Sequence, residues 1–257
     1  MPHDQVPGRV RLVGAGPGPA DLLTVRALRA IEGAQALLYD ALVSPEVLAL
    51  APSACVKIQT GKRAGRASMK QETINRLMLR LARRGLEVVR LKGGDPSIFG
   101  RVGEETQFLH AHGIETEVVP GVTAAAAAAA QFGFPLTHRG EARRLLITTA
   151  TTRDGSMLQS GWAAAADPET TLAIYMGRDQ LPAVLDRLMA NGRSPGTSAM
   201  AVENAGSPDA RAVPGTLADL ADNLAAAQVS GPVVVIVGDV TARAAVRAAP
   251  CRQTVAR

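Results

Sequence analysis

Aromatic residues are scarce in this sequence. Phe, Tyr and Trp together make up 3% of the 257 residues, which excludes ring stacking as the main way of holding a flat ligand. Nucleic-acid binders commonly combine such stacking with a stripe of positive charge. The arginines here are scattered along the chain, so no nucleic-acid partner is expected despite a net charge of +5.

Cysteine is almost absent, and no metal-binding pattern is present. Cys55 and Cys251 are the only two cysteines and lie far apart in the sequence. They form neither a disulfide framework nor a metal-ligand spacing, and the four histidines also lack such a spacing. No metal is therefore expected, and a reducing compartment is the default.

Long apolar runs are missing as well. The alanine-rich segment from Ala124 to Ala130 is too short to span a bilayer. The first ten residues contain no apolar stretch of the kind found in signal peptides. We expect a cytoplasmic protein with no membrane partner.

Lysine is rare, and arginine supplies nearly all of the positive charge. Only Lys57, Lys62, Lys70 and Lys92 are lysines among 28 basic residues. The planar guanidinium group matches the geometry of carboxylates, which favours a small anionic substrate.

Short apolar runs alternate with amphipathic stretches, a pattern typical of an α/β protein with a mostly parallel sheet. The predicted strands are Val10–Val13, Ala36–Tyr39, Cys55–Ile58, Val88–Leu91, Val118–Val119, Leu145–Thr149, Leu172–Tyr175, Thr197–Val202, Ala212–Val213 and Val233–Val237. The predicted helices are 22–31, 70–83, 104–112, 181–190 and 217–226.

A segment with two glycines and a proline divides the pattern into two halves. Gly133, Pro135 and Gly140 fall within it, and we place a hinge at residues 133–144. The predicted domains are therefore residues 1–132 and 145–257.

Two glycine-rich loops follow predicted strands, where α/β sheets bind ligands. The first, Gly14-Ala15-Gly16-Pro17-Gly18, has Pro19 where a dinucleotide fingerprint needs its third glycine. Asp40, however, lies where a ribose-binding acid would be expected, so an NAD-dependent oxidoreductase stays an alternative. The second loop, Gly93-Gly94-Asp95-Pro96, allows close approach of a ligand to the backbone. Taken alone, each loop is also compatible with a simple turn.

Together with further motifs, these loops resemble the uroporphyrinogen-III C-methyltransferases of the tetrapyrrole methylase family. The resemblance runs from residue 10 to about residue 240. The motifs that carry it are Val13-Gly14-Ala15-Gly16-Pro17-Gly18, Tyr39-Asp40-Ala41-Leu42-Val43-Ser44, Gly61-Lys62-Arg63-Ala64-Gly65, Leu91-Lys92-Gly93-Gly94-Asp95-Pro96, Phe99-Gly100-Arg101, Gly103-Glu104-Glu105, Val119-Pro120-Gly121-Val122-Thr123-Ala124, Pro135-Leu136-Thr137-His138-Arg139-Gly140, Tyr175-Met176-Gly177 and Val202-Glu203-Asn204.

The resemblance implies a two-domain α/β fold in which each half is a mixed sheet flanked by helices, with the active site in the cleft between the halves. It also implies a homodimer that uses S-adenosyl-L-methionine, releases S-adenosyl-L-homocysteine and methylates uroporphyrinogen III at two pyrrole carbons to give precorrin-2. That product feeds sirohaem, cobalamin or haem d1 synthesis.

The same resemblance assigns residues to roles. Asp40 and Lys62 match positions given proton-transfer roles, while Arg101, Glu104 and Arg139 match polar residues that face the tetrapyrrole. The matching cofactor contacts are Pro17, Gly93, Gly94, Asp95, Ile98, Thr123, Ala124, Met176 and Ala205.

Several positions depart from the family pattern. Ser97 replaces a bulky residue, Val102 replaces a glycine, and Ala41 stands where arginine is common. Ala150 and Ala205 stand where glycine is frequent. Val102 would be strained if the backbone there required a positive φ. Besides the oxidoreductase, a methylase of a later corrin precursor and a binder without turnover remain alternatives.

Overall fold

The computed structural model describes residues 6–61, 69–150 and 161–245, and the chain forms two compact units. The boundary in the sequence lies between Ala124 and Ala125, and Gly206–Pro208 also belong to the first unit. The hinge that we place at residues 133–144 stays a prediction.

The first unit is built on a five-stranded sheet in the order β3-β2-β4-β1-β5, and all of its described pairings are parallel. Its strands are β1 (Val10–Gly14), β2 (Ala36–Tyr39), β3 (Val56–Gln59), β4 (Val88–Lys92) and β5 (Thr116–Val119). Because the strands run in the same direction, the loops that follow them all leave from one edge of the sheet.

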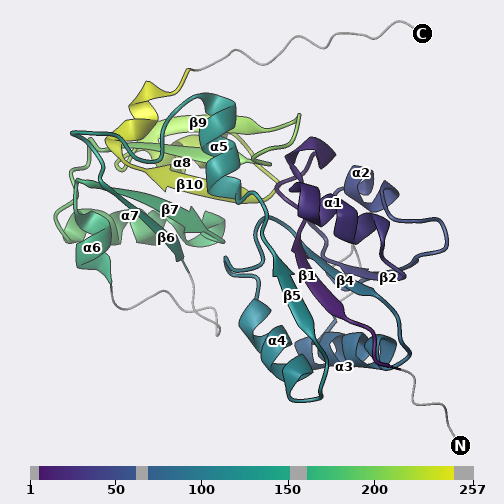
Figure 1. Cartoon of the computed structure of the whole chain (residues 1–257). Helices are drawn as coiled ribbons and strands as arrows, with labels where there is room; N and C mark the ends of the chain where they lie inside the picture. Colours follow the sequence, from purple (N-terminus) through teal and green to yellow (C-terminus); the bar gives the residue numbers. More distant parts are fainter. Residues whose placement is uncertain (1–5, 62–68, 151–160, 246–257) are drawn as a thin grey trace, which may run out of the picture. The chain divides into compact units, whose positions relative to one another are not determined.

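Helices cover both faces of this sheet, as Figure 1 shows. On one face, α1 and α2 pack against buried residues that include Val13 and Leu91. On the other face, α3 and α4 pack against Val10 and Leu38. The helical elements of this unit are η1 (Ala20–Leu22), α1 (Val25–Glu32), α2 (Pro45–Ala49), α3 (Gln71–Ala82) and α4 (Val102–His110).

The second unit contains a mixed five-stranded sheet in the order β6-β7-β10-β8-β9. The pairing of β6 with β7 is parallel, and the other pairings are antiparallel. The strands are β6 (Arg144–Thr149), β7 (Thr170–Tyr175), β8 (Ser198–Glu203), β9 (Arg211–Thr216) and β10 (Val233–Val237). The helical elements are α5 (Ala124–Phe132), α6 (Trp162–Ala166), η2 (Arg178–Gln180), α7 (Leu181–Ala190), α8 (Leu220–Ala226) and η3 (Asp239–Arg243).

The core of the second unit lies between its sheet and α6, α7 and α8. Fully buried Leu172 and Ile174 from β7 meet Leu188 from α7 and Leu220 from α8 in one apolar cluster. Residues two apart on a strand share a face, so β7 directs these leucine and isoleucine side chains toward the helices.

All ten strands predicted from the sequence are present, with shifted ends, and the two-domain α/β class is confirmed. The expectation of a mixed sheet in each half is wrong for the first unit. Helical crossovers join successive strands there, and such connections favour parallel pairing.

Three helices were not predicted from the sequence. Both α2 and α6 have five residues, too few for a helical period to be seen. In α5, seven consecutive alanines give no contrast between an apolar and a polar face. No helix in the described part of the chain is long and apolar enough to cross a membrane.

Candidate functional site

The loops after β1 and β4 are joined through their backbones. The amide of Gly94 donates to the carbonyl oxygen of Gly16 over 2.7 Å, and the amide of Gly16 donates to Gly94 over 3.2 Å. Both glycines have positive φ, of 68°, which costs little without a side chain. Because this pairing occupies the Gly16 amide, that amide does not serve a dinucleotide pyrophosphate.

The loop after β5 packs against both of these loops. A Cβ atom built on Gly121 would lie 2.3 Å from the carbonyl oxygen of Gly94 and 2.9 Å from the Cα of Gly14. Real side chains do not approach backbone atoms so closely, so only glycine fits at this meeting point. Three loops of the matched motifs therefore converge, and Thr123 lies beside Gly94.

The loop after β2 is tied to the same edge. The Ser44 hydroxyl donates to the carbonyl oxygen of Gly18 over 2.7 Å and accepts the amide of Val47, which caps α2. Gly61 packs against the same loop, because a Cβ atom built on Gly61 would lie only 2.3 Å from the backbone nitrogen of Ala41. Asp40 is thereby fixed on a loop that contacts the first glycine loop.

Asp95 joins the β4 loop to the β5 loop. Its Oδ2 accepts the amide of Gly121 over 2.9 Å, and its Oδ1 accepts the amide and the hydroxyl of Ser97. Burial raises the pKa of Asp95, but the hydrogen bonds from Ser97 and Gly121 outweigh it and hold the pKa below its ordinary value. Ser97, a departure from the family pattern, therefore supports a predicted cofactor-binding carboxylate.

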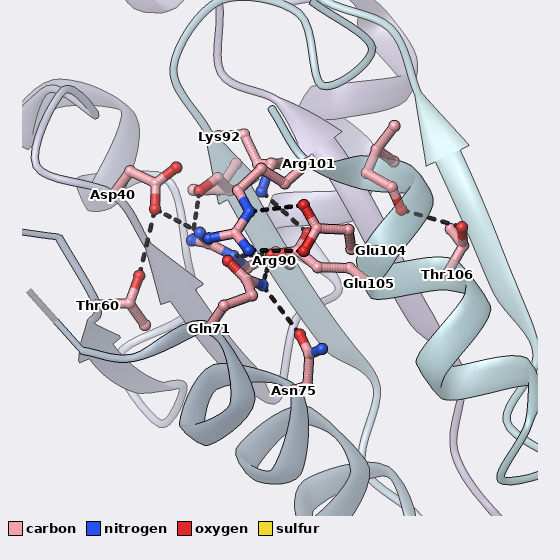
Figure 2. A network of polar contacts seen from close by, with 12 residues as sticks. Asp40, Thr60, Gln71, Asn75, Arg90, Lys92, Arg101, Glu104, Glu105 and Thr106 are labelled. Atoms are coloured by element: carbon pink, nitrogen blue, oxygen red, sulfur yellow. Dashed lines mark hydrogen bonds and ion pairs between the residues drawn. The ribbon is translucent and has the colours of Figure 1, made fainter. Parts of the chain in front are cut away.

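Buried charges connect Asp40 to the interior of the first unit, as Figure 2 shows. Arg90 donates from Nη2 to Oδ1 of Asp40 over 2.5 Å and from Nε to Oε1 of Glu105 over 3.3 Å. Lys92 donates to Oε2 of Glu105 over 2.9 Å. Desolvation by burial, together with the Arg90 cation, lowers the pKa of Lys92, although Glu105 acts in the opposite direction.

Neither Arg90 nor Glu105 was recognised as a candidate site residue from the sequence. The available signal was the strand Val88-Val89-Arg90-Leu91-Lys92, in which two cations interrupt an otherwise apolar and fully buried run. Charged residues in buried positions are rare unless they are paired.

Arg101 and Glu104 form an exposed ion pair at the start of α4. The guanidinium donates from Nε to Oε1 over 2.8 Å and from Nη2 to Oε2 over 2.6 Å. These hydrogen bonds raise the pKa of Arg101 further. Arg101 itself has the positive φ, of 58°, whereas Val102 lies within the helix and is not among the residues with positive φ. The strain considered for Val102 is therefore absent.

The remaining predicted contacts of the first unit lie on or beside the same loops. Pro17, Gly93, Ile98, Thr123 and Ala124 are all half-buried. A Cβ on Gly93 would lie 3.0 Å from the Cβ of Leu42, whose side chain is exposed.

Three predicted residues belong to the second unit. Met176 is 59% exposed and has a positive φ of 53°, an unusual combination for a large apolar residue. Arg139 is exposed and has no ion-pair partner in the described part of the chain. Ala205 is buried and follows Asn204, whose φ is also positive.

Lys62, a predicted proton-transfer residue, lies outside the described residues. Two arginines at the end of the predicted hinge, Arg143 and Arg144, pair with Glu169 and Asp167 on the surface. Among the described residues, no group of His, Cys, Asp or Glu is arranged to hold a metal ion.

Comparison with known proteins identifies the family. Residues 9–221 match the family described as Tetrapyrrole (Corrin/Porphyrin) Methylases. The chain belongs to this family. The resemblance of the motifs is thereby confirmed, and family membership argues against the dinucleotide interpretation of the first glycine loop.

Relatives of this tetrapyrrole methylase chain cover most of its length. It is 46% identical over 233 residues to a siroheme synthase of Azotobacter vinelandii, and the matched region covers 91% of the chain and 50% of that protein. It is also 46% identical over 235 residues to the chloroplastic S-adenosyl-L-methionine-dependent uroporphyrinogen III methyltransferase of Arabidopsis thaliana, covering 91% of the chain and 64% of the relative. The chain thus spans about half to two thirds of the length of these curated relatives.

A solved structure matches this methylase chain, and nearly the whole length of the solved chain is covered by the match. It is the uroporphyrin-III C-methyl transferase of Thermus thermophilus complexed with S-adenyl homocysteine, at 41% identity and a TM-score of 0.79. The match covers 91% of the present chain and 99% of that one.

Proposed function

We propose that this chain transfers methyl groups from S-adenosyl-L-methionine to two pyrrole carbons of uroporphyrinogen III, giving precorrin-2 for sirohaem, cobalamin or haem d1 synthesis. The observation that carries the proposal is the convergence of the matched motif loops after β1, β2, β4 and β5 at one edge of the first sheet. The names of relatives at 41–46% identity support the choice of donor and substrate.

The loops of the first unit fit the proposed cofactor. Gly93 and Gly94 present backbone without side chains, and Asp95 offers a carboxylate to ribose hydroxyl groups. Pro17, Ile98, Thr123 and Ala124 complete the proposed contacts of this unit. From the second unit we assign Met176 and Ala205, of which Met176 presents an exposed thioether side chain.

Bound S-adenosyl-L-methionine supplies a methyl group that its sulfonium already activates, so the residues have to align the substrate and handle a proton. Each transfer forms a carbon–carbon bond and breaks the sulfur–methyl bond, whose electron pair stays on sulfur. One proton leaves the tetrapyrrole. Alignment alone lowers such barriers by about 7–11 kcal/mol.

Arginines provide the recognition of a substrate with eight carboxylates. We assign Arg101 and Arg139 to these groups because both are exposed and lie in matched motifs. For Arg101, a substrate carboxylate takes the place that Glu104 occupies in the exposed ion pair. Exposed pairs of this kind contribute only about 0–1 kcal/mol, so the exchange costs little. We assign the Glu104 carboxylate to the ring of the substrate.

Asp40 and Lys62 are the proposed proton-handling residues. Oδ1 of Asp40 accepts from Arg90 and Thr60, and Oδ2 has no hydrogen-bond partner among the residues that the structure describes. We assign Oδ2 to a pyrrole N–H or to the departing proton. The proposal also includes a homodimer working in the cytoplasm, which sedimentation velocity and cell fractionation test.

The test is a methyl-transfer assay with methyl-labelled donor and two acceptors, uroporphyrinogen III and precorrin-2. Label in uroporphyrinogen III, with two methyl groups added, is the expected result. Transfer only to precorrin-2 would assign the chain to a later corrin step. Calorimetry that detects no binding of S-adenosyl-L-homocysteine would overturn the proposal altogether.

A further inference from the structure

Four charged side chains of the first unit form a connected group that we call the Arg90 network: Asp40, Arg90, Lys92 and Glu105. Glu105 is completely buried, and Arg90 and Lys92 are 3% and 4% exposed. Two positive and two negative charges balance one another. Asp40 is the exception in burial, because its side chain is 33% exposed.

The network joins three separate pieces of the chain. Asp40 follows β2, Arg90 and Lys92 come from β4, and Glu105 comes from α4 (Figure 2). Arg90 is the bridge, because its Nη2 reaches Asp40 and its Nε reaches Glu105. Glu105 accepts from Arg90 on Oε1 and from Lys92 on Oε2, so both of its oxygens are engaged.

Stability alone does not account for such a group. Removing charges from water costs energy that their mutual attraction barely offsets, and well-packed apolar residues of similar volume often serve equally well. What an arginine bridge provides is a fixed geometry, because the planar guanidinium group holds two carboxylates at set directions.

The geometry is transmitted to a single exposed carboxylate. The contacts of Asp40 with Arg90 and Thr60 both fall on Oδ1, which fixes the rotation of the side chain. In Figure 2 the second oxygen of Asp40 is turned away from these donors. The same helix that supplies Glu105 also carries Glu104 and begins directly after Arg101.

We propose that Arg90 and Glu105 are positioning residues for methyl transfer: Glu105 holds Arg90, and Arg90 fixes the Asp40 carboxylate so that Oδ2 meets the substrate. This inference rests on the proposed function and adds to it two residues that do not touch the substrate. Lys92 neutralises the remaining oxygen of Glu105 and thereby keeps the bridge in place.

The decisive variant is Arg90→Lys, which keeps the positive charge but does not span both carboxylates. A matched control is Arg11→Lys. Arg11 also joins two carboxylates, Glu117 at 3.1 Å and Glu87 at 3.0 Å, and it lies on the neighbouring strand β1. Both variants remove an arginine bridge from the same sheet, but only one bridge ends at Asp40.

We expect Arg90→Lys to lower kcat on uroporphyrinogen III by about 100-fold, the lower end of a typical proton-transfer contribution. The dissociation constant of S-adenosyl-L-homocysteine should change by less than about threefold. Arg11→Lys should leave kcat within about twofold of the parent. Melting temperatures and circular dichroism identify any variant that does not fold. Glu105→Gln should follow Arg90→Lys, and if it fails to fold, Arg90→Lys carries the test alone.

A double-mutant cycle with Asp40→Asn separates positioning from a general effect on the fold. If Arg90 acts through Asp40, then adding Arg90→Lys to Asp40→Asn lowers the rate by less than about threefold further. A single-turnover assay with labelled donor measures the slow rates of these variants.

Two results would overturn the inference: a kcat of Arg90→Lys close to that of the parent, or effects of Arg90→Lys and Asp40→Asn that multiply fully. A parent chain that transfers no methyl group to uroporphyrinogen III would instead overturn the proposed function. The two failures are therefore distinguishable.

Discussion

The backbone amide of Gly121 donates a hydrogen bond to the side-chain Oδ2 of Asp95 across 26 residues of sequence, over 2.9 Å. This bond joins the loop after β5 to the loop after β4, at the place where Gly121 also packs against Gly14 and Gly94. The packing of the loops, the orientation of the Asp95 carboxylate and the proposed cofactor contacts therefore depend on the same few atoms.

Gly121→Ala should disrupt this meeting point. The new Cβ would lie 2.3 Å from the carbonyl oxygen of Gly94, a backbone atom that has no side-chain freedom to yield. We expect a loss of S-adenosyl-L-homocysteine binding, measured by calorimetry, together with a lower Tm. The control is Gly103→Ala, because a Cβ there meets nothing within 4 Å and the residue lies in α4. That change should stabilise the chain by about 0.5–1 kcal/mol. Equal effects of the two variants on binding and Tm would contradict the role of Gly121 at the meeting point of the loops.

Ser97→Ala tests whether the departure at position 97 supports Asp95. The variant loses the hydroxyl donor to Oδ1 but keeps the backbone amide donor, so we expect a loss of about 0.5–1.5 kcal/mol in binding of S-adenosyl-L-homocysteine. Ser97→Thr retains a hydroxyl and should bind like the parent. Weaker binding by the threonine variant than by the alanine variant would show that bulk, rather than the hydrogen bond, decides.

Arg101→Ala should lower kcat/KM on uroporphyrinogen III by about 100-fold, because one carboxylate loses its guanidinium partner. Binding of the donor should be retained. The Tm should change little, because the ion pair with Glu104 is exposed.

Arg143→Ala is the matched control for this substitution. Arg143 is also exposed and also pairs with a glutamate, Glu169, but it lies outside the matched motifs. The activity of the Arg143→Ala variant should stay near that of the parent. Normal turnover by Arg101→Ala would remove Arg101 from the site.

Glu203→Gln should destabilise the second unit by about 1–3 kcal/mol. Glu203 is 3% exposed, and its Oε1 accepts the amides of Ser230 and Gly231 at 2.7 and 2.6 Å, while Oε2 accepts from Arg211. A glutamine keeps one acceptor oxygen but loses the charge. Thermal unfolding at pH 7 measures the difference, and an unchanged Tm would contradict the role of this carboxylate.

The difference in Tm between the parent and Glu203→Gln should also depend on pH. Burial raises the pKa of Glu203, but hydrogen bonds from Gly231, Arg211 and Ser230 outweigh it, so the pKa is lowered in the folded chain. A lowered pKa contributes stability above the unfolded value, about 4.3 for glutamate, and this stability is lost as the pH falls through the folded value. The difference in Tm between parent and Glu203→Gln should therefore shrink below about pH 4. A difference that grows toward acid pH would reverse the sign of this argument.

By itself, the sequence determined the α/β class, the positions of all ten strands and the matched loops. Strands such as Val233–Val237 are continuous apolar runs, and glycine loops at strand ends are local features that order and spacing reveal. The alanines of α5 give no contrast between an apolar and a polar face, so the sequence did not predict that helix.

Only the tertiary structure decided which partners the functional side chains have. The hydrogen bond from Gly121 to Asp95 and the bridge from Glu105 through Arg90 to Asp40 depend on the order of the strands in the sheet. β2 and β4 are separated by 48 residues of sequence but adjacent in space, and no local pattern specifies that adjacency. It follows from the burial of both sheet faces by α1, α2, α3 and α4, a property of the whole unit.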